Sequence, residues 1–599
     1  MALKIEDYAL IGDCHTAALV GNDGSIDWLC VPRFDSASVF GALLGDPDHG
    51  RWKLAPTQEV VETSRHYLED TFVLVTRWVT KTGEVEVTDF MPYGDRRADL
   101  ARRVKGISGS VELAQELRVR FEYAEALPWV RQTPEKHDNA LIAVAGPDAI
   151  IMRGPRLHAS DNSHASTFTV KAGESVDLSM TWYPSHREPP GHPDLDAGLA
   201  RTTKWWRDWS SSSTPSPVYE KEVRRSLLVL RALTHEDTGG IVAAATTSLP
   251  EDFGGSRNWD YRYVWLRDAS QTLHVLLNHG AGDEAPAWRN WLLRAVAGDP
   301  ADVQIMYGLS GERRLTEYEQ ASLPGYEGSS PVRIGNDAYS QYQGDVFGEV
   351  MLGLQSAREK GLEETEFSWP LQRALMHFVE DNWQRADNGI WEIRGTLRHF
   401  THSRAMIWAA FDCAVKAVRD FGLDGPVERW ESIRDQVRDE IELKGFDRKR
   451  NTYTQYFGST NVDASLLQLS QIGYVTPDDP RMLGTVAAIE QELLRDGLVL
   501  RYRTETDVDG LPPGEHPFLA CSFWLAEQYA RSGRVDDATT LMDRLVSFCN
   551  DVGLLSEEYD PAGMRQVGNT PQALSHLALV RAADAISAAR AREKTDHRA

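Results

Sequence analysis

Two segments far apart in the chain could supply a pair of carboxylates for acid–base chemistry. Glu392 follows Trp391 within residues 388–395, where an Asn-Gly pair predicts a turn that presents both side chains outward. Glu557 and Glu558 lie side by side in the second segment. Cleaving a glycosidic bond requires one carboxylic acid that protonates the leaving oxygen and a second carboxylate on the other face of the sugar. We therefore expect Glu392 to be the proton donor and either Glu557 or Glu558 to be the base.

The surroundings of Glu392 should decide its protonation state. Trp391 and Ile390 are apolar neighbours, and an apolar environment raises the pKa of a carboxyl group because it disfavours the charged form. The positive charge of Arg394 would act in the opposite direction. The structural alternative is an exposed loop glutamate that pairs with Arg394, together with solvated acids in the second segment.

A charged pair stands inside an aromatic-rich segment, residues 260–268. Arg267 and Asp268 follow Trp265 closely. The arginine fork and the carboxylate oxygens can bind neighbouring sugar hydroxyls while an indole covers the apolar face of the ring. A salt bridge between the two side chains is the alternative. In the loop over 307–336, Arg333 is the expected ligand contact.

Apolar positions at helical spacing predict twelve helices in the second half of the chain. The connections after the second, fourth, sixth, eighth and tenth helices are short, and the others are long. Because every second connection of an antiparallel array emerges at the same end, the long ones should share one rim, which is then the candidate site. The pattern predicts an α/α barrel. The expected helices are 217–236, 262–280, 284–299, 337–360, 364–384, 402–421, 426–443, 462–472, 479–495, 515–532, 535–550 and 570–588.

Residues before about 195 follow a different period. Alternating apolar residues at 72–90 predict a hairpin, and similar alternation recurs at 113–121 and 176–183. The predicted fold class is multidomain β + α, an N-terminal antiparallel β-sandwich followed by an (α/α)6 barrel. The expected domains are a sandwich with a linker helix over 1–209, a Ser- and Pro-rich linker over 210–217, the barrel over 218–590 and a polar tail over 591–599.

Residues 22–35 allow two interpretations. Their tight Asn-Asp-Gly turn predicts a hairpin with a polar, aromatic exit. Either this hairpin is an ordinary edge of the sandwich, or it brings Asp27, Trp28 and Arg33 to the barrel rim.

Composition narrows the class of partner. A formal net charge of −25 disfavours nucleic acid and acidic membranes, so we expect a small neutral sugar as the partner. Five widely spaced cysteines without a Cys-x-x-Cys pair indicate neither a disulfide framework nor a zinc site. The N-terminus has no basic segment followed by an apolar run, and no long apolar stretch occurs, so we expect a cytoplasmic protein. Assembly into a homo-oligomer is left open.

Several long motifs resemble those of glycoside hydrolase family 15. They are residues 24–35, 258–268 with Trp-Leu-Arg-Asp, 328–336 with Pro-Val-Arg-Ile-Gly-Asn, 389–392 with Gly-Ile-Trp-Glu, 399–403 with His-Phe-Thr-His-Ser, and 554–558 with Leu-Leu-Ser-Glu-Glu. The resemblance spans essentially the whole chain, with the motifs in family order. It implies a β-sandwich before an (α/α)6 barrel and hydrolysis with inversion of the anomeric configuration.

The resemblance also assigns roles to residues. It implies Glu392 as the acid and Glu557, rather than Glu558, as the base. Trp265, Arg267 and Asp268 match the residues that hold the non-reducing glucose. Further substrate-binding residues expected from these motifs and their loops are Trp259, Arg333, Trp391, Arg394 and His399. This chain has Gly-Ile-Trp-Glu-Ile where fungal glucoamylases have Asp-Leu-Trp-Glu-Glu, so two supporting carboxylates are missing.

The expected reaction is hydrolysis of an α-glucoside with release of β-glucose. Among family substrates we favour trehalose over malto- or isomalto-oligosaccharides, which glucoamylases and glucodextranases cleave. Two other classes are a glycoside phosphorylase and a non-catalytic sugar-binding protein. Chemistry by two carboxylates requires no cofactor, and no metal-ligand spacing stands out. Assistance by phosphate or Mg²⁺ is left open.

Overall fold

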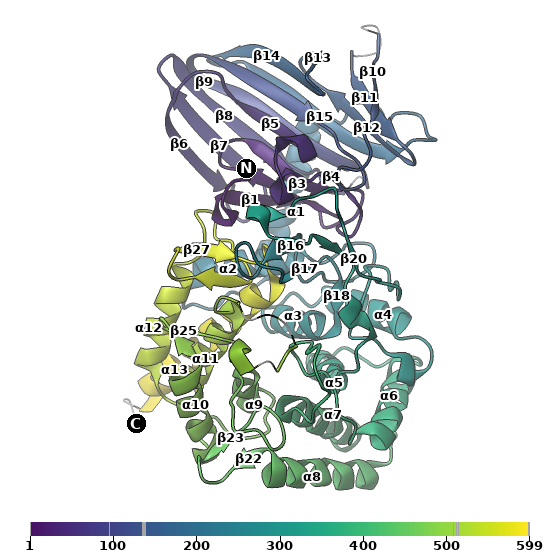
Figure 1. Cartoon of the computed structure of the whole chain (residues 1–599), viewed down its shortest axis with the longest axis vertical. Coiled ribbons are helices and arrows are strands. Elements are labelled where there is room, and N and C mark those ends of the chain that lie inside the picture. The colour runs from purple at the N-terminus through teal and green to yellow at the C-terminus, as the bar shows by residue number, and fades with distance from the viewer. Residues whose placement is uncertain are drawn as a thin grey trace.

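The computed structural model describes residues 2–94, 96–134, 139–506, 508–510, 512 and 514–596. The large sheet lies at one end of the molecule and most of the helices lie at the other, as Figure 1 shows. The strands β1–β15 pair antiparallel throughout, and the helices form a barrel. The predicted fold class is confirmed.

One long strand, β9 (Ala98–Arg118), belongs to both layers of the sandwich. Its first half pairs with β8 (Gly83–Phe90) and β15 (Ser175–Pro184). Its second half pairs with β5 (Arg51–Pro56) and β14 (Ser163–Lys171). The two layers are therefore joined through a shared backbone as well as through their common core.

Both hairpins expected from the sequence are present. They are β2 (Ala17–Gly21) with β3 (Ser25–Cys30), and β7 (Leu74–Thr80) with β8. The remaining strands of the sandwich are β1 (Tyr8–Gly12), β4 (Ser38–Phe40), β6 (Val60–Tyr67), β10 (Trp129–Gln132), β11 (Leu141–Ala145), β12 (Asp148–Arg153) and β13 (His158–Ser160).

Six helical elements form a closed inner ring, in which each contacts the next and the last contacts the first. They are α3 (Leu266–Asn278), α5 (Asp345–Glu359), α7 (Thr401–Arg419), the short pair η8–α9 (Ala464–Leu467 and Gln468–Gln471), α11 (Leu519–Arg531) and α13 (Ala573–Asp596). The outer helices are α2 (Glu220–Ala232), α4 (Glu284–Ala295), α6 (Ser368–Asn382), α8 (Val427–Lys444), α10 (Pro480–Glu492) and α12 (Val535–Val546). Each predicted helix corresponds to one of these elements.

Burial distinguishes the two rings. In the inner helix α11 every residue from Leu519 to Ala530 is buried. The outer helix α8 buries only one face, at intervals of three or four residues, as expected of an amphipathic helix between core and solvent. The buried residues of α8 are Val427, Trp430, Ile433, Val437 and Ile441.

Several predicted helices begin later than expected, and two of these late starts have a local reason. Helix α3 begins at Leu266 rather than at 262, because residues 264–265 pair as β18 with β19 (Met306–Tyr307). Helix α5 begins at Asp345 rather than at 337, because η7 (Asp337–Ser340) is a separate 3-10 turn.

The ends of the predicted linker and tail also differ from the structure. The helix α1 (Leu195–Ser212) includes the first three residues of the linker, because serine hydroxyls of its last turn bond back to carbonyls three residues earlier. Residues 591–596 continue α13 instead of forming a tail, since this stretch contains no Gly or Pro to end the helix. The domain limits themselves stay predictions.

The hairpin within residues 22–35 joins the two domains. Trp28 donates to Ala245 O at 3.0 Å, and Arg33 contacts Ser310 and Glu312 of the α4–α5 connection. Asp27 instead stays in the sandwich, where it accepts from Tyr8 and Ser25. Trp28 and Arg33 therefore reach the barrel, as the second interpretation of this hairpin expected, whereas Asp27 does not.

The cysteines are free, and four of the five are buried; Cys549 is half-buried. Among the described helices, none combines the length and apolar character needed to cross a membrane.

Candidate active site

A pocket opens on the barrel rim where long connections meet. It contains both glutamates proposed as acid and base, and four of the six long connections contribute to its wall. Its lining residues are Ala243, Glu251, Arg257, Trp259, Tyr261 and Trp265 before α3, Arg267 and Asp268 at the start of α3, Ile390, Trp391, Glu392 and Arg394 before α7, Arg501, Tyr502, Asp509 and Phe518 before α11, and Glu557, Gln572 and Leu574 around the start of α13.

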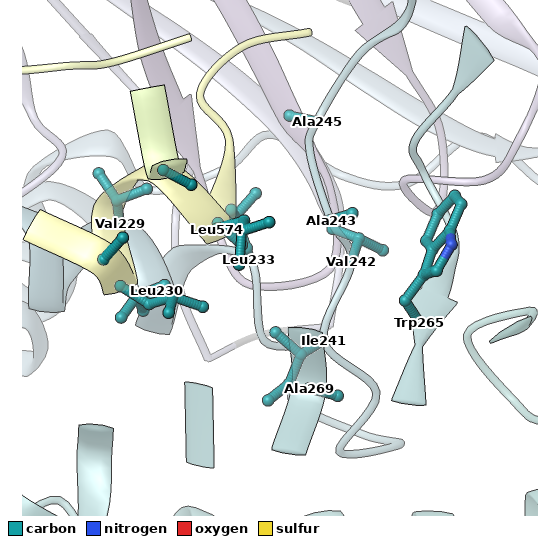
Figure 2. Close-up of a cluster of buried hydrophobic side chains, with 14 of the residues drawn as sticks. Val229, Leu230, Leu233, Ile241, Val242, Ala243, Ala245, Trp265, Ala269 and Leu574 are labelled. Atoms are coloured by element: carbon teal, nitrogen blue, oxygen red, sulfur yellow. The ribbon is translucent and has the colours of Figure 1, made fainter. Parts of the chain in front are cut away.

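Apolar packing fixes one side of this pocket. Figure 2 shows Trp265 beside Val242 and Ala243, at the edge of a buried cluster that includes Leu233 and Leu574. Since closely packed side chains have little freedom to shift, Trp265 is held in one position.

Glu392 occupies a strained turn. Its φ is +57°, a left-handed conformation that is rare for residues other than glycine. Gly389 also has positive φ, and a Cβ added there would lie 2.8 Å from the Phe400 ring. The turn closes through a bond from Ile393 N to Asn388 O at 3.0 Å. The Asn-Gly turn predicted from the sequence is thus present, and it aims Glu392 into the pocket.

The segment at the start of α3 holds this turn in place. Trp265 Nε1 donates to Glu392 Oε1 at 2.6 Å, and Arg267 Nη1 donates to Ile390 O at 2.9 Å. Burial raises the pKa of Glu392, while the positive charge of Arg267 and the Trp265 bond oppose the shift, and Arg394 contributes less. The alternative interpretation, an exposed Glu392 that pairs with Arg394, is wrong, because Arg394 pairs with Glu317 at 2.9 Å.

Glu557 is fixed on one carboxylate oxygen and free on the other. Tyr261 OH donates to Oε1 at 2.5 Å, whereas Oε2 has no hydrogen-bond partner within the described residues. Gly568, at φ +82°, packs directly on this side chain, and a Cβ there would lie 2.7 Å from Glu557 Oε2. Oε2 is therefore buried, and it is the carboxylate oxygen that keeps an unused acceptor position.

Burial, followed by the negative charge of Glu251, raises the pKa of Glu557 to about 8. Arg501 and the Tyr261 hydroxyl oppose this shift. Both proposed catalytic carboxyl groups therefore have raised pKa values, although the sequence suggested this only for Glu392.

Glu558 has a different environment from Glu557. It is fully buried, does not line the pocket, and accepts from His516 N at 3.0 Å. Its other oxygen lies 3.5 Å from Arg501 Nη2. Of the two adjacent glutamates, only Glu557 reaches the pocket.

Three carboxylates near the pocket are close enough to hold a metal ion. Glu251, Glu515 and Glu558 offer oxygens that all lie within 4.8 Å of one another. Arg501 Nη2 already lies 2.8 Å from Glu251 and 2.6 Å from Glu515. This guanidinium and that of Arg257, which lies 3.9 Å from Glu251 and 3.7 Å from Glu515, supply positive charge to the cluster.

Trp265, Arg267 and Asp268 reach the pocket together. Arg267 Nε also donates to Asp268 Oδ1 at 2.9 Å, so the salt bridge considered from the sequence is present in the pocket wall. The paired groups still present guanidinium and carboxylate edges to a ligand. Their role in binding stays a prediction.

Aromatic residues make up much of the remaining wall. Trp391 Nε1 donates to both oxygens of Asp463, at 2.9 and 3.0 Å. The guanidinium groups of Arg333 and Arg394 lie over the Trp259 ring, 4.5 and 4.3 Å from its centre. Arg394 and both tryptophans line the pocket.

Two residues expected at the site lie away from it. Arg333 is not in the pocket lining, because it packs over Trp259, pairs with Glu317 at 3.3 Å and donates to backbone carbonyls. His399 is also outside, since its ring stacks on Phe457 and bonds with Arg404. Arg333 therefore supports the pocket wall through Trp259, and His399 belongs to a neighbouring loop.

Sequence reasoning missed several lining residues. Tyr261 lay inside the aromatic-rich segment but received no role, although it is the partner of Glu557. Arg257, Arg501, Tyr502 and Asp509 also line the pocket. The run Arg-Tyr-Arg at 501–503, in a long connection on the rim side, has the same mixture of aromatic and charged residues as 261–265 and could have drawn attention to it.

Two carboxylates, Glu557 buried and Glu392 half-buried, lie with arginines and indoles on the rim of an α/α barrel behind a β-sandwich, and this arrangement defines a glycoside hydrolase. The model of glycosyl hydrolases family 15 matches residues 217–584. A second model, described as trehalase-like, N-terminal, matches residues 1–179. The chain belongs to glycosyl hydrolases family 15, in agreement with the resemblance of its motifs.

Two relatives and one solved structure are similar to this chain along nearly its full length. A trehalase from Mycobacterium tuberculosis is 35% identical over 99% of this chain and 90% of its own length. A trehalase from Thermoplasma volcanium is 34% identical over 97% of this chain and 93% of its own. A bacterial glucoamylase complexed with acarbose has a TM-score of 0.72 at 13% identity, covering 98% of this chain and 94% of that one. The last similarity concerns the fold.

Proposed function

We propose that the protein hydrolyses trehalose with inversion of configuration at the attacked carbon. The names of the full-length relatives and of the N-terminal family model support this substrate. The observation that carries the mechanism is the pair of carboxylates in one pocket: Glu392, held by Trp265, and Glu557, whose Oε2 has no hydrogen-bond partner among the described residues.

In the proposed reaction, Glu392 protonates the interglycosidic oxygen as the bond to C1 breaks. Glu557 Oε2 takes a proton from water, and the oxygen of that water forms the new bond to C1 from the opposite face. A separation of about 6.5–9.5 Å between the carboxyl groups is expected of this geometry. No metal or phosphate takes part in these steps.

We assign the attacked glucose to Trp265, Arg267 and Asp268. The hydrogen-bonding groups of the pair suit vicinal hydroxyls, and the indole suits an apolar ring face. Trp259, Trp391 and Arg394 are assigned to the departing glucose. Arg333 and His399 have no direct contact in this scheme. A cytoplasmic location stays a prediction.

Comparing substrates tests the proposal. The purified full chain is incubated with trehalose, maltose, isomaltose and maltoheptaose, with and without inorganic phosphate, and glucose and glucose 1-phosphate are measured. The proposal predicts the highest kcat/KM for trehalose and glucose alone as product. A preference for maltoheptaose would indicate a glucoamylase-type enzyme, and phosphate-dependent glucose 1-phosphate a phosphorylase. Binding of trehalose without any product would indicate a sugar-binding protein.

A further inference from the structure

Within residues 258–268, called here the active-site segment, residues 259–262 present alternate side chains to opposite sides. Trp259 and Tyr261 line the pocket. Asp260 and Arg262 do not, and both are fully buried on the side of the sandwich. In Figure 1, β17 (Asn258–Asp260), which forms the start of this segment, and its partner strand β16 (Thr247–Pro250) lie between the sandwich and the barrel.

Arg262 connects the active-site segment to the sandwich. Its Nη1 donates to Ser36 O at 2.8 Å and approaches Cys30 Sγ at 3.3 Å, and its Nη2 donates to Tyr123 OH at 2.9 Å. Ser36, Cys30 and Tyr123 all belong to the N-terminal domain. The same guanidinium is bound within the segment by Asp260, at 2.9 and 2.7 Å.

We propose that Arg262 is a positioning residue through which the sandwich sets the places of Tyr261 and Trp265, and through them of both catalytic glutamates. The inference rests on the function proposed above. It makes the N-terminal domain a structural part of the active site. Arg262 itself touches neither the pocket nor a substrate.

The chemistry of a buried guanidinium supports this role. A buried charge must have its hydrogen-bonding groups satisfied, since removing partners from a buried ion is costly. Asp260 accepts hydrogen bonds from Nε and Nη2 of Arg262, and Ser36 O and Tyr123 OH of the sandwich accept further bonds of this guanidinium. Any displacement of the domains would therefore pull on Arg262, whose chain neighbour Tyr261 bonds to Glu557.

The backbone beside Arg262 transmits this position to the pocket. Ala244 N donates to Tyr261 O at 2.9 Å, and Ala243 N donates to Tyr263 O at 3.0 Å. Ala243 is itself part of the pocket wall. On the other side, Gly335 N donates to Asp260 Oδ2 at 3.2 Å. The segment is thus held between the sandwich on one side and the barrel backbone at residues 243–244 and 335 on the other.

Two variants test the proposal in the full chain. Arg262→Lys removes the planar fork but keeps the charge, and Tyr123→Phe removes one hydroxyl from the sandwich side. The matched control is Arg65→Lys. Arg65 is likewise buried at the domain interface and binds Asp551 at 2.7 and 2.6 Å, but it does not contact the active-site segment.

Arg262→Lys is expected to lower kcat roughly tenfold to a hundredfold while KM changes little, because misplacement of catalytic groups affects the chemical step. The acidic limb of the pH profile should also move to higher pH, since a weakened Tyr261 bond raises the pKa of Glu557; Glu251 and Arg501 also face this group. Tyr123→Phe should show a smaller change in the same direction. Arg65→Lys should lower the melting temperature without changing kcat or the pH limb.

The proposal would be overturned if the folded Arg262→Lys and Tyr123→Phe variants had the kcat and the pH limbs of the unmodified protein. It would also be overturned if Arg65→Lys lost as much kcat as Arg262→Lys. If Arg262→Lys does not fold, Tyr123→Phe decides alone. All variants are assayed on whichever glucoside the unmodified protein cleaves best. A failure of the proposed trehalose specificity is therefore separate from a failure of this inference.

Discussion

Tyr261 and Trp265 meet edge to face, with ring centroids 5.5 Å apart. Tyr261 donates to Glu557 and Trp265 donates to Glu392. Two carboxylates that are 165 positions apart in the sequence are therefore oriented by one pair of aromatic side chains that both lie within residues 261–265. The spacing of the acid and the base depends on how this short stretch is held.

Removal of the Tyr261 hydroxyl should impair the base. Tyr261→Phe is expected to lower kcat about 10- to 100-fold, because Glu557 loses the bond that orients it. That bond also lowers the pKa of Glu557, so the acidic limb of the kcat/KM profile should move to higher pH. Tyr263→Phe is the control, since Tyr263 is on the same segment but outside the pocket. Equal behaviour of the two variants would count against the assignment.

The charge of Glu251 should be visible in the pH profile. Turnover requires Glu557 to be ionised and Glu392 to be protonated, so the profile is expected to rise as Glu557 ionises, around its pKa of about 8, and to fall as Glu392 loses its proton. Glu251 raises the pKa of Glu557, so Glu251→Gln should move the acidic limb to lower pH by roughly half a unit to one unit. Glu515 also pairs with Arg501 but does not line the pocket; Glu515→Gln should have less effect. A shift to higher pH in Glu251→Gln would contradict the electrostatic argument.

Glu557 should reduce stability at neutral pH. Its pKa is about 8 in the folded protein against an ordinary value of 4.5, so the folded state binds more protons than the unfolded state between these values. Stability is therefore lost as pH rises through this window. Glu557→Gln should be more stable than the unmodified protein at pH 7, on the order of 1–3 kcal/mol, and nearly equal near pH 4.5. Melting temperatures measured across this range test it; a constant difference would refute the linkage.

Gly568 should be intolerant of a side chain. Gly568→Ala adds a Cβ 2.7 Å from the Glu557 side chain, and we expect kcat to fall about tenfold or more because the base is displaced. Gly533→Ala is the control: Gly533 also has positive φ, but nothing lies within 4 Å of an added Cβ. Both variants should lose about 1–2 kcal/mol of stability from backbone strain. Only Gly568→Ala should lose turnover.

The sequence predicted the barrel well because each helix leaves a local signal. The spacing of Val427, Trp430 and Ile433 in α8 shows one buried face without reference to the rest of the fold. The alternation of short and long connections then fixes the rim. Helix starts leave a weaker signal: the apolar pattern at 262–265 looks helical, but Val264 and Trp265 pair with Tyr307 and Met306, which follow much later in the chain.

Side-chain partners across the pocket could not be read in the same way. Nothing local distinguishes Arg333, which supports Trp259 from behind, from Arg394, which lines the pocket. Likewise, Tyr261 gains its significance only from Glu557, which lies 296 positions away. The raised pKa of Glu557 depends on the burial and on Glu251, both set by the tertiary structure.

The most direct test of the two-glutamate account is the anomeric form of the first glucose released from trehalose, followed by NMR before mutarotation. Inversion at one carbon, with the other glucose departing unchanged, predicts equal initial amounts of β- and α-glucose. Release of α-glucose alone at early times would mean retention of configuration, and it would contradict the roles assigned to Glu392 and Glu557.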